Sequence, residues 1–243
     1  MQNSKTPEAT PAYSYPQFTE EMRKTYKILV PNMLPVQLGL ICRLMKNYGY
    51  DMELLHTEGP NIAEQGLRNV HNDTCYPALL VIGQFLDALN SGKYDLDHTA
   101  LLITQTGGGC RASNYIKLLR KALVKAGYGN IPVASLNFSG LEKGSGLPLT
   151  VPLLRKVIAS IFYGDMLVAL RSQTHAYENH RGDADAMTEK WISTIQGWIR
   201  DDKNYSAHDM KRRFYDIAAD YATIPITRVP KVKVGVVGEI YVK

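Results

Sequence analysis

Short apolar runs alternate with longer amphipathic segments along the first half of the chain. The first run ends at Pro31 and Asn32, and the run 100–104 is continuously apolar, as strands are when a sheet buries them on both faces. The longer segments repeat apolar residues at helical spacing. We therefore predict strands at 24–30, 52–55, 100–104 and 131–136, and helices at 37–48, 76–89 and 113–126. This alternation predicts an α/β fold, a Rossmann-like lobe with a mostly parallel sheet and helices on both faces.

The second half of the chain has a different pattern. Three amphipathic segments predict a C-terminal helical block at about 152–221, with helices at 152–171, 184–199 and 207–221. The last run, 231–242, is strongly strand-like, and no helix follows it. We expect it to open a second, truncated α/β lobe; the alternative is a terminal strand tied into the first sheet. The expected division is a flexible leader at 1–22, the cysteine-bearing lobe at 23–228, and the start of the second lobe at 229–243.

Composition narrows the class of protein. The apolar fraction of 45% and the charged fraction of 21% are ordinary for a globular protein. A net charge of +5 without a basic run interleaved with aromatic residues disfavours nucleic-acid binding. No apolar run reaches the ~20 residues of a membrane span, and the polar stretch 1–16 lacks the apolar core of a signal peptide. Three cysteines argue against a secreted disulfide framework, so we expect a cytoplasmic protein.

Two of these cysteines occupy similar corners of the predicted fold. Cys110 follows the strand that begins the sequence LLITQTGGGCRAS at 101–113, and a helix comes directly after it. Cys75 lies just before another helix, whose first turn contains Pro77. Ligands of parallel sheets bind beyond the carboxyl ends of the strands, and helix N-termini stabilise thiolates. We therefore expect the two thiols to share one site.

The loop before Cys110 adds backbone freedom and a positive charge. Gly107, Gly108 and Gly109 allow close approach of backbone N–H groups, and Arg111 adjoins them. Three interpretations of this site remain open. The first is a set of ligands for an iron–sulfur cluster, and the second is a glycine loop that binds phosphate. The third is that the cysteines are simply small hydrophobic side chains buried in the core. The chain lacks a C-x-x-C pair, ferredoxin spacing, and the usual phosphate-loop patterns.

The third cysteine, Cys42, has a different environment. It lies in the first predicted helix on the same face as four apolar or aromatic residues, Leu38, Ile41, Met45 and Tyr48. We predict that Cys42 belongs to the core. Asp73, Gln84 and Gln105 lie near the corners of Cys75 and Cys110 and are candidates to orient the ligands.

Three motifs together resemble one protein family. They are NDTCYPALLVIGQ at 72–84, TQTGGGCRASN at 104–114 and GVVGEIYV at 235–242. The chain from 26 to 243 resembles the C-terminal region of large proteins related to 2-hydroxyacyl-CoA dehydratases and their ATP-dependent activases. This resemblance implies Rossmann-like lobes whose cysteines, here Cys75 and Cys110, hold a [4Fe–4S] or larger cluster. In that family the activase hydrolyses ATP and passes a low-potential electron to the cluster, which drives reduction and dehydration of an acyl-CoA.

The chain departs from that family in three respects. This sequence contains no nucleotide-binding activase module and no complete second lobe, and only two cysteines match the motifs where the wider family uses three. We therefore expect an iron–sulfur lobe for electron transfer that is incomplete as an enzyme by itself. Its expected partners are an activase module or the remaining dehydratase-like lobe, with an acyl-CoA and further copies of the chain. The alternative is a non-catalytic α/β scaffold, or a module that binds CoA or phosphate without metal.

Overall fold

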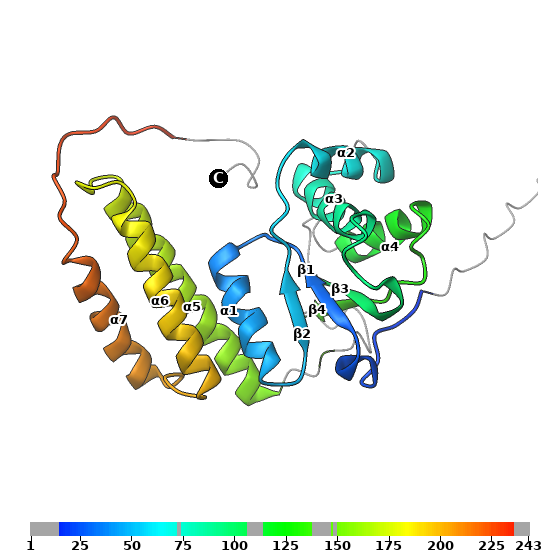
Figure 1. The fold of residues 1–243 in the computed structure, drawn as a ribbon, viewed down its shortest axis with the longest axis horizontal. Helices are drawn as coiled ribbons and strands as arrows, with labels where there is room; N and C mark the ends of the chain where they lie inside the picture. The colour runs from blue at the N-terminus through cyan, green and yellow to red at the C-terminus, as the bar shows by residue number, and fades with distance from the viewer. Residues whose placement is uncertain (1–14, 72–73, 106–113, 138–146, 148–149, 236–243) are drawn as a thin grey trace, which may run out of the picture.

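A parallel sheet and a bundle of long helices make up the two parts of the computed structural model (Figure 1). It describes residues 15–71, 74–105, 114–137, 147 and 150–235. The strands are β1 (Lys27–Val30), β2 (Asp51–Leu54), β3 (Thr99–Gln105) and β4 (Val133–Asn137). The helices are α1 (Pro35–Lys46), α2 (Pro60–Asn69), α3 (Tyr76–Asn90), α4 (Tyr115–Lys125), α5 (Val151–His175), α6 (Asp183–Arg200) and α7 (Ala207–Tyr221).

All four strands of the sheet run parallel, in the order β2-β1-β3-β4. Lys27 of β1 is in register with Asp51 of β2 on one side and with Thr99 of β3 on the other. The chain therefore winds outward from β1 to β2, then crosses back to β3. This order confirms the predicted Rossmann-like α/β fold. The reversal places a topological switch point between β1 and β3, where such sheets bind ligands.

Helices cover both faces of the sheet, which explains the continuous apolar strands. Successive residues of a strand point to opposite faces. Ile28 and Val30 of β1 therefore join the core beneath α1, while Leu29 joins the core beneath α3 and α4. All three are at most 3% exposed.

Helix α2 was not predicted from the sequence, and it packs closely against α3. Only Ile62 and Gly66 of α2 are buried, so its apolar pattern is weak. Gly66 faces Leu79 of α3, and Gly83 of α3 faces Ile62 of α2, so the two helices run antiparallel. The absence of side chains on both glycines lets the two backbones approach. The two helices therefore pack backbone to backbone at these glycines, a contact that a search for apolar side chains does not detect.

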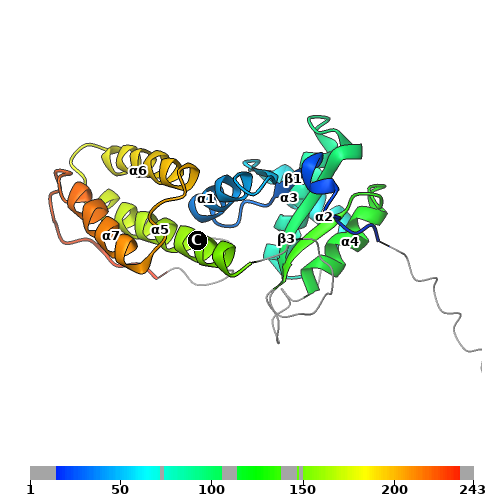
Figure 2. The ribbon, with the colours of Figure 1, turned by 90° about the horizontal axis from the view of Figure 1, so that it is seen from below.

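The predicted helical block is present and joins the sheet through α1 (Figure 2). One hydrophobic core extends from the β1 and β2 side chains through α1 to Tyr163 of α5, Trp191 of α6 and Ile217 of α7. Gln37 of α1 donates from Nε2 to Asp165 of α5 at 2.8 Å. The block is therefore packed onto the lobe rather than tethered to it.

Two strand predictions need correction. Met22–Lys24 forms a 3-10 turn, so the first strand begins only at Lys27. The strand expected at 231–242 is not formed over its described part, 231–235. There Val232 is 90% and Val234 79% exposed. A strand needs a neighbour to pair with its backbone, and no described strand pairs with these residues. Residues 236–242 lie outside the described part.

Within the described residues, no helix combines the length and apolar character needed to cross a membrane. This finding agrees with the lack of a long apolar run in the sequence.

The start of α6 gives a testable pH dependence. The Glu178 carboxylate accepts hydrogen bonds from the backbone N–H groups of Ala184 at 2.8 Å and Gly182 at 2.9 Å, and these bonds lower its pKa. A lowered pKa in the folded state means that the stabilisation is present above the unfolded value, near 4.5, and is lost as the pH falls through the folded pKa. We expect Glu178→Gln to melt below the unchanged protein at pH 7, with the two melting temperatures converging at acid pH.

Thermal melts between pH 7 and pH 3 measure this difference. Glu189→Gln is a matched control, because Glu189 is exposed on α6 itself and makes no hydrogen bond or ion pair with any described residue. A constant gap between Glu178→Gln and the unchanged protein over the whole pH range would contradict the capping role.

Candidate functional site at the start of α3

Cys75 occupies the position immediately before α3 and is half-buried. Its backbone is extended, with φ −59° and ψ 144°, and Pro77 lies in the first turn of the helix. Proline is well suited to this position because the first N–H groups of a helix have no partner within it. The Cys75 carbonyl oxygen accepts the Leu79 N–H at 3.2 Å, which starts the helix. The sequence thus fixes the thiol at the end of α3 where the helix dipole is positive.

Gln84 ties the middle of α3 to the carboxyl edge of the sheet. Its Oε1 accepts the Asn32 N–H at 2.7 Å, just after β1, and its Nε2 donates to the Thr57 carbonyl at 2.9 Å, beyond β2. Gln84 is 5% exposed, so both bonds are shielded from water. Cys75 precedes Gln84 by nine residues, or roughly 13 Å along the helix axis. The first half of α3 therefore projects past the edge at which parallel sheets bind ligands.

Cys75 contacts the beginning of α4. Its Sγ lies 3.4 Å from the hydroxyl oxygen of Tyr115, the first residue of that helix. Tyr115 is 7% exposed, and it follows Cys110 by only five residues in the sequence. The structure therefore brings Cys75 to the helix that directly follows the second cysteine motif.

The rest of the predicted site falls outside the described residues. These residues are Gly107, Gly108, Gly109, Cys110 and Arg111. The same holds for Asp73, which was a candidate to orient the ligands. The expectation that Cys75 and Cys110 share one site thus stays a prediction.

Cys75 lies at the N-terminus of α3, and the first turn of that helix contains no acidic residue. A helix N-terminus carries a partial positive charge. A half-buried thiol of this kind can serve as a metal ligand or a nucleophile. In the described part of the chain, no group of three or more His, Cys, Asp or Glu residues could hold a metal ion by itself. Among the described residues, Cys75 thus offers a single sulfur donor at this corner.

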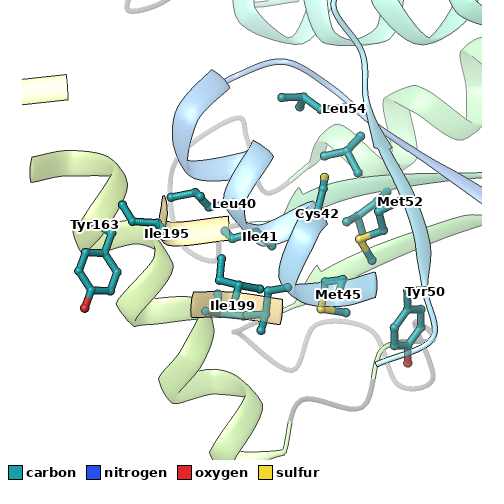
Figure 3. Close-up of a cluster of buried hydrophobic side chains, with 14 of the residues drawn as sticks. Leu40, Ile41, Cys42, Met45, Tyr50, Met52, Leu54, Tyr163, Ile195 and Ile199 are labelled. Atoms are coloured by element: carbon teal, nitrogen blue, oxygen red, sulfur yellow. The ribbon is translucent and has the colours of Figure 1, made fainter. Parts of the chain in front are cut away.

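Cys42 is a core residue, as predicted. Its side chain lies among apolar residues of α1 and β2, including Met52 and Leu54 (Figure 3). It is 6% exposed, and burial raises the pKa of the thiol to about 12. A neutral thiol packed in this way is a small hydrophobic side chain rather than a ligand.

Tyr115 is the residue of this site that the sequence did not reveal. Its only signal is an aromatic hydroxyl two residues after the end of the sequence TQTGGGCRAS, at a helix start. Gln84 was identified as a candidate to orient the ligands, but its bonds to the loops after β1 and β2 became visible only in the folded structure.

No protein-family model matches this chain, and no curated protein or solved structure matches it either.

Proposed function

We propose that the chain is an iron–sulfur-binding lobe of a 2-hydroxyacyl-CoA dehydratase-like system, with Cys75 and Cys110 as protein ligands. It takes part in ATP-driven, low-potential electron transfer together with an activase module or a further lobe. The carrying observation is the contact of Cys75 Sγ with Tyr115, at the start of the helix that follows the Cys110 motif.

The charge and burial around Cys75 support this proposal. A thiolate ligand needs an electropositive setting and room for the metal. The N-terminus of α3 supplies the first, and the partial exposure of Cys75 supplies the second. Cys42 offers neither, because its thiol is enclosed in the core and has a raised pKa.

Each described residue of the site has a distinct part in the proposal. Cys75 binds iron as a thiolate, and the Tyr115 hydroxyl donates a hydrogen bond to its sulfur. Gln84 holds α3 against the loops after β1 and β2, which fixes the position of Cys75. A bound iron–sulfur cluster supplies one-electron transfer, at a potential that such hydrogen bonds tune.

The proposal predicts that iron binding depends on Cys75 and not on Cys42. After anaerobic reconstitution with ferrous iron and sulfide, the unchanged chain should be brown and contain both elements. Cys75→Ser and Cys110→Ser should each lower the retained iron about tenfold. Cys42→Ala should keep the iron and lose only about 1 kcal/mol of stability, from lost packing. Iron and sulfide assays, electron paramagnetic resonance and urea unfolding measure these results.

Two outcomes would contradict the proposal. A chain that stays colourless and iron-free after reconstitution would favour the scaffold or CoA-binding alternative. Equal loss of iron in Cys42→Ala and Cys75→Ser, with folding intact, would mean that the ligand assignment is wrong.

A further inference from the structure

A groove separate from the cysteine site runs along α1, between the edge strand β2 and helix α6. It encloses about 490 Å³. That volume lies in the range of small-molecule pockets. The residues that matter to its chemistry are Gly39, Arg43 and Lys46 of α1, Leu54 of β2, and Glu189 and Ile192 of α6. We call it the α1–α6 groove.

The floor of this groove is apolar and contains a gap at Gly39. Leu40, Met52 and Leu54 line it and belong to the buried core, and Ile192 packs against that core. A methyl group built on Gly39 would lie 4.0 Å from Leu54 Cδ2 and closer to no other atom. Glycine inside a helix costs about 0.5–1 kcal/mol relative to alanine. No neighbouring atom is close enough to require glycine at position 39. The lack of a side chain on Gly39 leaves this part of the groove open.

Two cations line the groove with no partner among the described residues. Arg43 and Lys46 make no hydrogen bond and no ion pair there, although Arg43 is only half exposed. They stand three residues apart on α1, where like charges repel. Both cations lie in the last turn of α1, where the negative end of the helix dipole favours positive charge. Both also line the groove, so a ligand bound there would meet two positive charges without a described partner.

The acidic residues of the groove do not neutralise this pair. Glu53 is already held by Lys27 at 3.4 Å, by Lys93 at 3.0 Å, and by the Tyr94 hydroxyl at 2.8 Å. Glu189 is exposed on the α6 wall and forms no ion pair with a described residue. The groove thus combines an apolar floor with an unpaired cationic end.

From this combination we infer that the α1–α6 groove binds an organic anion with an apolar chain, through a carboxylate or phosphate held by Arg43 and Lys46. The chain of the ligand lies over Gly39 and Leu54, where it displaces water from apolar surface. The anionic head satisfies the guanidinium of Arg43, which pairs with oxyanions in a bidentate manner. This inference is independent of the cluster at Cys75, because it involves neither cysteine motif.

Binding of matched eight-carbon probes to the 243-residue chain tests the inference. Octanoate and octyl phosphate carry the two possible heads, while 1-octanol and octylammonium carry the same chain without a negative charge. Isothermal titration calorimetry should detect both anions, with the neutral and cationic probes at least about tenfold weaker, since a charge-assisted contact is worth roughly that factor. The anion that binds more tightly identifies the preferred head.

Variants of the groove should separate charge from shape. Arg43→Met and Lys46→Met should each weaken octanoate binding about tenfold, and Glu189→Gln should strengthen it. Gly39→Leu should abolish binding by filling the groove. Lys211→Met is the control, because Lys211 lines a different groove, between α5 and α7, that is also largely apolar.

The outcomes are distinguishable even if one variant fails to fold. Circular dichroism melts identify any unfolded variant, and Arg43→Met changes only a half-exposed side chain that has no described partner. Equal affinity for octanoate and 1-octanol, or loss of binding in Lys211→Met but not in Arg43→Met, would overturn the inference.

Discussion

Replacing Gly83 by alanine should unfold the α2–α3 pair or lower the stability of the whole chain by about 3 kcal/mol or more. A methyl group at this position would lie 1.9 Å from the carbonyl oxygen of Ile62 and 2.9 Å from the backbone nitrogen of Gly66. Both atoms belong to the backbone of α2, so neither can rotate away as a side chain could. The two helices would have to separate, exposing the apolar surface between them. Urea unfolding followed by circular dichroism measures the loss.

Gly197→Ala is the matched control for this prediction. Gly197 also lies within a helix, but a methyl group there would meet only the end of the Arg200 side chain, at 4.0 Å. Removing glycine from the interior of α6 should therefore stabilise the chain by about 0.5–1 kcal/mol. Similar stabilities for the two variants would mean that α2 and α3 do not approach as closely as the structure shows.

Replacing Gln84 by leucine should cost about 2–4 kcal/mol of stability and should also lower iron retention at Cys75. The change removes both hydrogen bonds and leaves the Asn32 N–H and the Thr57 carbonyl without this buried partner. A polar group left unsatisfied in the interior costs about 1–3 kcal/mol. Since Gln84 fixes α3 to the sheet edge, the start of the helix should become less well positioned. Urea unfolding and iron analysis after anaerobic reconstitution measure the two effects.

Gln173→Leu controls for the replacement of an amide by an apolar side chain. Gln173 is exposed on α5 and makes no hydrogen bond with a described residue. Its substitution should change the stability by less than about 0.5 kcal/mol. A stable Gln84→Leu chain that lost iron would still support the positioning role, whereas a stable chain with full iron retention would remove it.

The local pattern of the sequence predicted most of the elements. The strands β1 to β4, and helices α1, α3, α4, α5, α6 and α7, were all expected within a few residues of their observed bounds. Strands buried on two faces and helices with one apolar face are encoded by residues close together in the chain. The core position of Cys42 followed from the same helical spacing. The apolar spacing is less informative at the end of α4, where Val124 follows the buried Leu123 but is 39% exposed.

Elements whose stability depends on a distant partner were not predicted correctly. Helix α2 has few apolar residues, and only the glycine contacts with α3 explain its place. The segment 231–235 has the alternation of a strand but no described strand to pair with. The strand prediction, which rested on this local pattern alone, is therefore wrong for these residues. A strand is stable only when its backbone groups are paired across a sheet, and no single segment contains that information.

The candidate sites show the same division. The sequence by itself determined that Cys75 precedes a helix and that Cys42 lies on an apolar helix face. Only the tertiary structure placed Tyr115 against Cys75, Gln84 between two loops, and Arg43 beside the apolar groove of β2 and α6. The order of the strands and the packing of α6 on α1 set these contacts. They depend on residues far apart in the chain, which the spacing of neighbouring residues does not specify.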